Sequence, residues 1–177
     1  MKNPYKTISS RVVYKNPWMR LIEDKITHRD GKGIYSYVDK LPGVVVVALT
    51  AKKEIYLVGQ WRYAIKKYSW ELPMGRVEEG ENTLLGAKRE LQEEIDRIAK
   101  KWKKINTYYL ADGMTNQIMH IYLAQDLHDA PGVPDDSEYL SVKKVSISKI
   151  KKMIKSGTVF DGPTITAFYQ FKLHTGL

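Results

Sequence analysis

Three glutamates, Glu90, Glu93 and Glu94, stand at positions i, i+3 and i+4 of one short segment. On an α-helix, residues at this spacing are neighbours on the same face, and like charges there destabilise an isolated helix by about 0.2–0.5 kcal/mol per pair. Carboxylate oxygens are ligands that Mg²⁺ prefers, so a bound divalent cation would reverse this repulsion. The spacing therefore predicts an acidic, metal-binding helix face.

The same predicted helix has an apolar side that can anchor it on a core. The apolar residues at helical spacing are Leu84, Ala87, Leu91 and Ile95. A solvated helix face, in which Arg89 pairs with Glu93, is the alternative interpretation of the charges. The apolar stripe, the arginine and the glycines that precede the helix favour the metal-binding interpretation.

The segment before the helix predicts a tight loop. Glu71 to Gly75 ends an expected strand with a proline and a glycine, both of which interrupt regular structure. Gly80 marks a turn, and Asn82 or Thr83 is expected to cap the helix. The backbone of such a glycine-containing loop can approach a ligand closely.

The stretch from Gly75 to Glu94 resembles the signature of the Nudix hydrolases. In that signature a glycine is followed, after five residues, by glutamate and, after seven more, by Arg-Glu-apolar-x-Glu-Glu-x-Gly-apolar. The matching residues here are Gly75, Glu81, Arg89, Glu90, Leu91, Glu93 and Glu94. Asp96 stands where the family has glycine, and Arg97 where it has an apolar residue. Both departures concern the exit turn of the helix and not the acidic cluster.

The flanking segments resemble the nucleoside diphosphate sugar branch of this family, typified by ADP-ribose pyrophosphatases. That branch carries a Gln-x-Arg-Tyr segment and a Trp-Glu-Leu-Pro-x-Gly segment, which match residues 60–63 and 70–75. Gly157 to Asp161, with Thr164, is similar to the ending of the branch. The resemblance implies an α/β/α sandwich around a mixed sheet. It also implies a homodimer in which the N-terminal strands of one subunit contribute to the other's site across the interface.

The resemblance further implies Mg²⁺-dependent hydrolysis, with Mn²⁺ as an alternative, of the pyrophosphate bond of nucleotide sugars such as ADP-ribose and GDP-mannose. The expected catalytic residues are Glu90, Glu93 and Glu94, and the same three carboxylates, with the carbonyl of Met74, are the expected metal ligands. Arg89 is expected to orient one of these carboxylates, and Glu81 to support it.

Substrate contacts are expected at Arg62, Trp18, Tyr37, Glu71, Gly75 and Met114. The guanidinium of Arg62 can bridge two phosphate oxygens, although a surface ion pair is the alternative. Trp18 and Tyr37 are candidates for stacking on a nucleobase, although aromatic residues in strands more often serve packing.

The loop that follows the helix departs from the branch in a way that concerns the general base. The branch commonly has Ser-Pro-Gly-x-x-x-Glu here, whereas residues 111–117 read Ala-Asp-Gly-Met-Thr-Asn-Gln. Gln117 cannot accept a proton as a carboxylate can. The base must come from elsewhere, and the candidates are Asp112, Asp135, Asp136, Glu138, Glu93 and Glu94.

The order of expected elements favours two parts and an α/β fold. Residues 1–41 contain short alternating runs and an Asp30-Gly31 hairpin signal, which predict a small antiparallel β subdomain. The resemblance to the branch implies that this subdomain serves dimerisation and substrate contacts. Residues 42–177 are expected to form the hydrolase domain. Its central strand, Val44 to Leu49, should be buried on both faces. Two further helices are expected, one ending near Lys155 and one from Thr164 to Phe171.

Several remaining side chains are expected to be structural. Trp61 and Trp70 are expected in the core, and His120, which alternates within a strand, is expected to pack there.

Composition limits the classes of function. The 177 residues include no cysteine, which excludes disulfides, zinc–thiolate sites and cysteine nucleophiles. No apolar run approaches the ~20 residues of a membrane span, and the N-terminus lacks the apolar core of a signal peptide, so we expect a cytoplasmic protein without membrane contact. The net charge of +9 comes largely from lysines that we expect to form a solvated surface, and nucleic acid is not an expected partner.

Two alternative functions stay open at this point. An RNA 5′-end pyrophosphohydrolase is favoured slightly by the net charge of +9. A non-catalytic sensor that binds ADP-ribose or a nucleotide is favoured by Gln117, but the intact acidic cluster argues against it.

Overall fold

The computed structural model describes residues 2–29, 31–133 and 139–177, which form two compact units. The first unit contains the residues up to Leu41 together with Tyr109–Ile118. The second contains Pro42–Tyr108 and Met119–Leu177. Among the residues that the structure describes, no helix has the length and apolar character that a membrane crossing needs.

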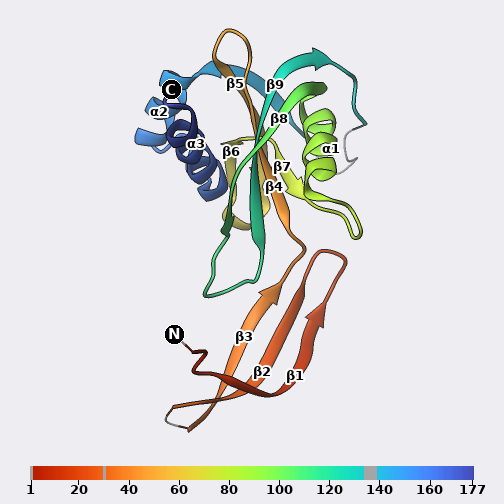
Figure 1. Cartoon of the computed structure of the whole chain (residues 1–177), viewed down its shortest axis with the longest axis vertical. Coiled ribbons are helices and arrows are strands. Elements are labelled where there is room, and N and C mark those ends of the chain that lie inside the picture. Colours follow the sequence, from red (N-terminus) through yellow and green to blue (C-terminus); the bar gives the residue numbers. More distant parts are fainter. Residues whose placement is uncertain (1, 30, 134–138) are drawn as a thin grey trace. The chain divides into compact units, whose positions relative to one another are not determined.

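The first unit is built on a three-stranded antiparallel sheet (Figure 1). Its strands, in spatial order, are β1 (Lys6–Lys15), β2 (Arg20–His28) and β3 (Gly31–Asp39). The loop from Tyr109 to Ile118 is fastened to β3, because the Val38 N–H donates to the Met114 carbonyl over 2.9 Å. The expected N-terminal antiparallel sheet is therefore confirmed, although Asp30 of the expected hairpin turn lies outside the described residues.

The second unit contains two sheets (Figure 1). One has the order β7 (Met74–Arg76), β4 (Gly43–Ala48), β9 (Ile118–Asp129) and β8 (Arg97–Tyr109). The other has the order β10 (Ser141–Ser146), β5 (Glu54–Arg62) and β6 (Lys67–Glu71). Strand β4 is parallel to β9 and antiparallel to β7, so the first of these sheets is mixed. Every residue of β4 is buried, as expected for a central strand covered on both faces.

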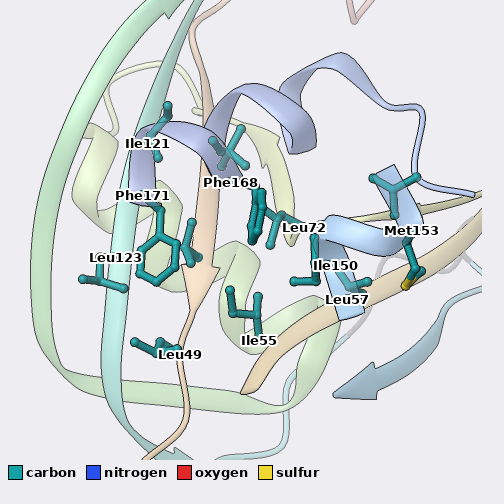
Figure 2. Packing of buried hydrophobic residues seen from close by; sticks show 14 of the residues in the cluster. Leu49, Ile55, Leu57, Leu72, Ile121, Leu123, Ile150, Met153, Phe168 and Phe171 are labelled. Carbon is teal, nitrogen blue, oxygen red and sulfur yellow. The ribbon is translucent and has the colours of Figure 1, made fainter. Parts of the chain in front are cut away.

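Helices cover the sheets of the second unit from two sides (Figure 1). Helix α1 (Thr83–Ile95) packs on one side, where Ala87, Leu91 and Ile95 join a buried cluster with residues of β4. Helices α2 (Ile147–Lys155) and α3 (Gly162–Thr175) pack on the other. There Phe168 and Phe171 lie in a second core with residues of β5 and β9 (Figure 2). The expected α/β/α sandwich around a mixed sheet is confirmed.

Three local expectations differ from the structure. Trp61, expected in the core, is 59% exposed near the end of β5, whereas Trp70 packs against the core as expected. Strand β10 was not expected from the sequence. Helix α3 starts at Gly162, before the expected Thr164, because the Asp161 carboxylate caps it by accepting from the Thr164 N–H over 2.8 Å.

Candidate active site

Helix α1 carries the three glutamates, and local interactions fix both of its ends. The Asn82 side chain accepts hydrogen bonds from the amides of Leu84 and Leu85 at 3.1 and 2.9 Å, which satisfies two first-turn donors. The helix ends at Asp96, which adopts the left-handed conformation with φ 55°. Since the apolar side of α1 is anchored on the core, the glutamate positions are fixed relative to strands β4 and β7.

The carboxylate of Glu90 lies against the backbone of Gly75 in β7. A β-carbon built at position 75 would overlap the carboxylate carbon and both oxygens of Glu90. Only glycine leaves this space open, so the glycine of the signature permits the approach of helix and strand. Glu90 is 9% exposed, so its carboxylate is held close to β7 and largely away from bulk solvent.

A second carboxylate of α1 is joined to the backbone just before Gly75. The Met74 N–H donates to Oε2 of Glu94 over 3.0 Å, and Glu94 is 6% exposed. The Met74 backbone and the Glu94 carboxylate, both expected metal ligands, are therefore direct neighbours.

Arg89 is the cation among these carboxylates. Its Nη1 donates to Glu90 and Glu93 at 2.8 and 2.9 Å, and its Nη2 donates to Glu81 at 3.2 Å and to the Arg76 carbonyl at 2.7 Å. Burial lowers the pKa of the Arg89 guanidinium, but its carboxylate partners outweigh burial and raise that pKa above its ordinary value. Burial likewise opposes ionisation of Glu81, but the bond to Arg89 prevails and lowers the pKa of that carboxyl.

The candidate metal-ligand atoms near Gly75 are carboxylate and carbonyl oxygens, which suit Mg²⁺ or Mn²⁺ better than a softer metal. Across residues 2–29, 31–133 and 139–177, however, no three acidic or histidine side chains are already arranged to hold an ion. Arg89 engages Glu90 and Glu93 together. Binding of a cation at this face would require these carboxylates to exchange part of their contact with Arg89.

Arg62 lies at the end of β5, and its guanidinium forms a bidentate ion pair with Glu71 of β6. Nε donates to Oε1 of Glu71 over 2.9 Å, and Nη2 donates to Oε2. The bond to Glu71 raises the pKa of Arg62, with smaller contributions from the charges of Asp161 and Glu94. The structure thus brings Arg62 within electrostatic reach of Glu94. Glu71 is 1% exposed, and both of its carboxylate oxygens accept hydrogen bonds from Arg62.

Asp161 belongs to this charged cluster and was not among the expected site residues. Burial raises the pKa of its carboxyl, and the nearby Glu71 adds to that effect. The sequence signal that marks it is the spacing Asp161-Gly162-Pro163-Thr164, a helix start with an acidic cap and an early proline.

Trp18, Tyr37 and Met114 belong to the first unit. Trp18 is 67% exposed and Met114 is 70% exposed, whereas Tyr37 is half-buried in β3. Gln117 is buried, and its Nε2 donates to the Leu41 carbonyl over 3.0 Å. This residue therefore holds the loop to the end of the N-terminal segment.

Of the acids considered as general base, Asp112 is exposed in the loop of the first unit. Asp135, Asp136 and Glu138 lie outside the described residues.

The two departures from the signature have local structural roles. Asp96 accepts a hydrogen bond from the Gly132 N–H over 2.8 Å, and its carbonyl accepts from Ala130 over 3.1 Å. Arg97 lies over the Tyr56 ring at 5.6 Å and pairs with Asp129 at 2.7 Å. Both residues fasten the end of β9 and the loop after it to the exit of α1.

His120 lies in β9, in register with Val44 of β4, which in turn pairs with Gly75 of β7. Its Nδ1 is buried, and no hydrogen-bond partner for it is found within the described residues. Burial, together with the charge of Lys104, lowers the pKa of His120 below its ordinary value.

The fold and the site define an α/β/α protein with an acidic helix face set against a glycine in a strand. Residues 39–168 match the NUDIX domain, and residues 5–38 match the nucleoside diphosphate sugar hydrolase N-terminal domain. The chain therefore belongs to the Nudix family, as its sequence predicts, and it is a Nudix hydrolase.

The similarity to known proteins extends over nearly the whole chain. It is 30% identical over 175 residues to an ADP-ribose pyrophosphatase of Bacillus subtilis, covering 97% of this chain and 95% of that protein. It is 26% identical over 176 residues to the methanol dehydrogenase activator of Bacillus methanolicus, with the same coverage. A crystal structure of an ADP compounds hydrolase matches the fold with a TM-score of 0.86 at 16% identity, covering 97% of this chain and 94% of that one.

Proposed function

We propose that this protein hydrolyses the pyrophosphate bond of nucleoside diphosphate sugars of the ADP-ribose and GDP-mannose type. The products would be a nucleoside monophosphate and a sugar phosphate. The observation that carries the proposal is the joint contact of Glu90 with Gly75 and of Glu94 with the Met74 amide. These contacts hold two carboxylates of α1 beside one backbone segment. The match of residues 5–38 to the nucleoside diphosphate sugar hydrolase N-terminal domain supports this substrate class.

The proposed cofactor is Mg²⁺, with Mn²⁺ as the alternative. When bound, such an ion neutralises phosphate charge and acidifies water. Glu90, Glu94 and the Met74 carbonyl would hold it, and Glu93 would complete the set or position the attacking water. Arg89 and Glu81 would keep these carboxylates oriented through their mutual bonds.

Arg62 is the proposed phosphate-binding residue. Its Glu71 partner fixes the guanidinium plane, and the five donors of an arginine exceed the two that Glu71 engages. A pre-oriented guanidinium loses less freedom when it binds a diphosphate. Gly75 would bring the β7 backbone to the substrate. Trp18, Tyr37 and Met114, which lie in the first unit, are proposed to contact the nucleoside.

The test is turnover of a panel that contains ADP-ribose, GDP-mannose and 5′-triphosphorylated RNA, each with Mg²⁺ and with EDTA. A phosphatase releases phosphate from the monophosphate products for detection. Metal-dependent turnover of the nucleotide sugars, lost in Glu94→Gln while the melting temperature is retained, is the expected result. Turnover of RNA alone, or substantial activity in Glu94→Gln, would contradict the proposal.

We further propose that the protein is a homodimer in which the N-terminal strands contribute across the interface. All ten residues of β1 are exposed, and the apolar ones include Ile8, Val12 and Tyr14, each about half exposed. An exposed apolar edge strand is a surface that another chain tends to cover. Light scattering should give the mass of two chains. In Val12→Lys it should give a larger monomer fraction, whereas Thr7→Lys on the same strand serves as a polar-site control.

A further inference from the structure

The segment between β6 and β7 passes from one sheet of the second unit to the other. Strand β6 ends at Glu71, β7 begins at Met74, and the two belong to different sheets. Pro73 has no N–H, and its carbonyl accepts from the Val46 N–H over 2.8 Å. Leu72 is 1% exposed, so its N–H needs a partner inside the protein.

That partner comes from a helix far along the chain. The Leu72 N–H donates to the side-chain oxygen of Thr164 over 2.9 Å, across a separation of 92 residues. Thr164 is fully buried in the first turn of α3, and its own N–H donates to Asp161. The first turn of α3 therefore holds the backbone of Leu72 in place.

The next N–H along this segment is that of Met74, which donates to Glu94 over 3.0 Å. Every backbone N–H from Leu72 to Met74 is thus bonded to a side chain of a helix, one of α3 and one of α1. Only Pro73, whose ring fixes φ, separates Leu72 from Met74, so the two anchored amides lie close together along the chain.

Asp161, which caps α3, also interacts electrostatically with the Arg62–Glu71 pair. Its charge acts on Arg62, and the charge of Glu71 acts on Asp161. The start of α3 therefore contacts the segment that carries Met74 and acts electrostatically on Arg62, although α3 supplies none of the proposed ligands.

We propose that Thr164 is a positioning residue for the metal site, acting through the Leu72 amide on the Met74 carbonyl and Glu94. This inference deepens the proposed function and rests on it. The hydroxyl is the essential group, because a valine of the same shape leaves the buried Leu72 N–H without an acceptor. A serine keeps the oxygen and should keep the role.

The experiment compares wild type, Thr164→Val and Thr164→Ser. The matched control is Thr175→Val, which removes a hydroxyl bond to the Phe171 carbonyl at the far end of the same helix. Mn²⁺ binding is measured without substrate by the electron paramagnetic resonance signal of the free ion, at a temperature at which every variant is folded. Amide exchange at Leu72, kcat and KM are measured alongside.

We expect Thr164→Val to weaken Mn²⁺ binding by about 10-fold or more, as loss of a group that orients a ligand does. It should also speed exchange at Leu72 and lower kcat more than it raises KM. Thr164→Ser and Thr175→Val should bind Mn²⁺ like wild type. A Thr164→Val variant with a lower melting temperature but unchanged Mn²⁺ affinity would overturn the inference and leave the proposed function standing. Failure of the wild-type protein to bind Mn²⁺ or hydrolyse the panel would overturn both.

Discussion

The carboxylate of Glu90 occupies the space in which a side chain at position 75 would have to begin. Helix α1 and strand β7 therefore approach each other as closely as they do because residue 75 is glycine. The proximity of two proposed ligand groups, on α1 and just before Gly75, depends on this approach.

Replacement of Gly75 by alanine should strongly reduce the proposed activity. The new methyl group would displace Glu90 or push β7 away from α1. We expect a loss of about 100-fold or more in kcat/KM, which corresponds to about 2.7 kcal/mol of transition-state stabilisation. Kinetics with ADP-ribose and Mg²⁺ would check this. Gly33→Ala is the control, because the nearest atoms to its new β-carbon, in His28, are at an ordinary 3.5 Å. Equal activity of the two variants would show that the Glu90–Gly75 contact is dispensable.

Replacement of Arg89 by alanine should destabilise the metal-free protein. It would leave Glu81, Glu90 and Glu93 without their shared cation, at a cost of about 1–3 kcal/mol. Mg²⁺ at millimolar concentration should restore part of this stability, because an ion that binds only the folded state stabilises it. Thermal unfolding in EDTA and in Mg²⁺ measures both effects.

Arg11→Ala is the control for that comparison. It removes an exposed pair with Glu23, whose arginine side chain is 68% exposed, so the cost should be about 0.2–1 kcal/mol at most. The cost should be the same with and without Mg²⁺. A deficit of Arg89→Ala that is also independent of Mg²⁺ would argue against a cation at this acidic face.

Variants at Asp96 should test the combined contribution of its left-handed conformation and its side-chain hydrogen bond at the exit of α1. Alanine would lose both the tolerance of the left-handed conformation and the bond to the Gly132 N–H, with an expected loss of about 2 kcal/mol in the free energy of unfolding. Asparagine keeps both properties and should stay within about 0.5 kcal/mol of wild type. Urea unfolding measures the difference, and equal stability of the two variants would contradict this account.

Stability should fall as the pH is lowered past the ordinary pKa of histidine, near 6.5, in part because of His120. Burial and the charge of Lys104 lower its pKa in the folded protein, so the unfolded chain binds a proton more readily. Protonation then favours unfolding as the pH falls from about 6.5 through the lowered pKa. Urea unfolding at pH 7.5 and 5.5 should show a smaller loss for His120→Gln than for wild type. An identical loss in both would assign the pH effect to other groups.

The sequence alone determined the local parts of this protein. The acidic helix, its Asn82 cap and its apolar stripe follow from spacings within about four residues, which helix geometry converts directly into neighbours. Strand β4 was likewise evident, since a continuous apolar run is typical of a strand covered on both faces. The family signature gave the fold class, which the comparisons confirm.

Local patterns did not indicate how these parts meet. The exposure of Trp61 was mispredicted, because an aromatic residue in a strand is buried only where another layer covers that strand. The Arg62–Glu71 pair depends on the register of β5 and β6, and β10 pairs with β5 across a long separation in sequence.

Only the tertiary structure decided that Glu90 faces Gly75, that Arg89 gathers three carboxylates, and that Thr164 receives the Leu72 amide. The physical reason is range. A helical repeat fixes neighbours a few residues apart, whereas contacts between distant segments depend on sheet order and on the packing of whole layers. Sheet order and layer packing are set by the burial of the two hydrophobic cores as a whole. No short sequence pattern specifies that burial.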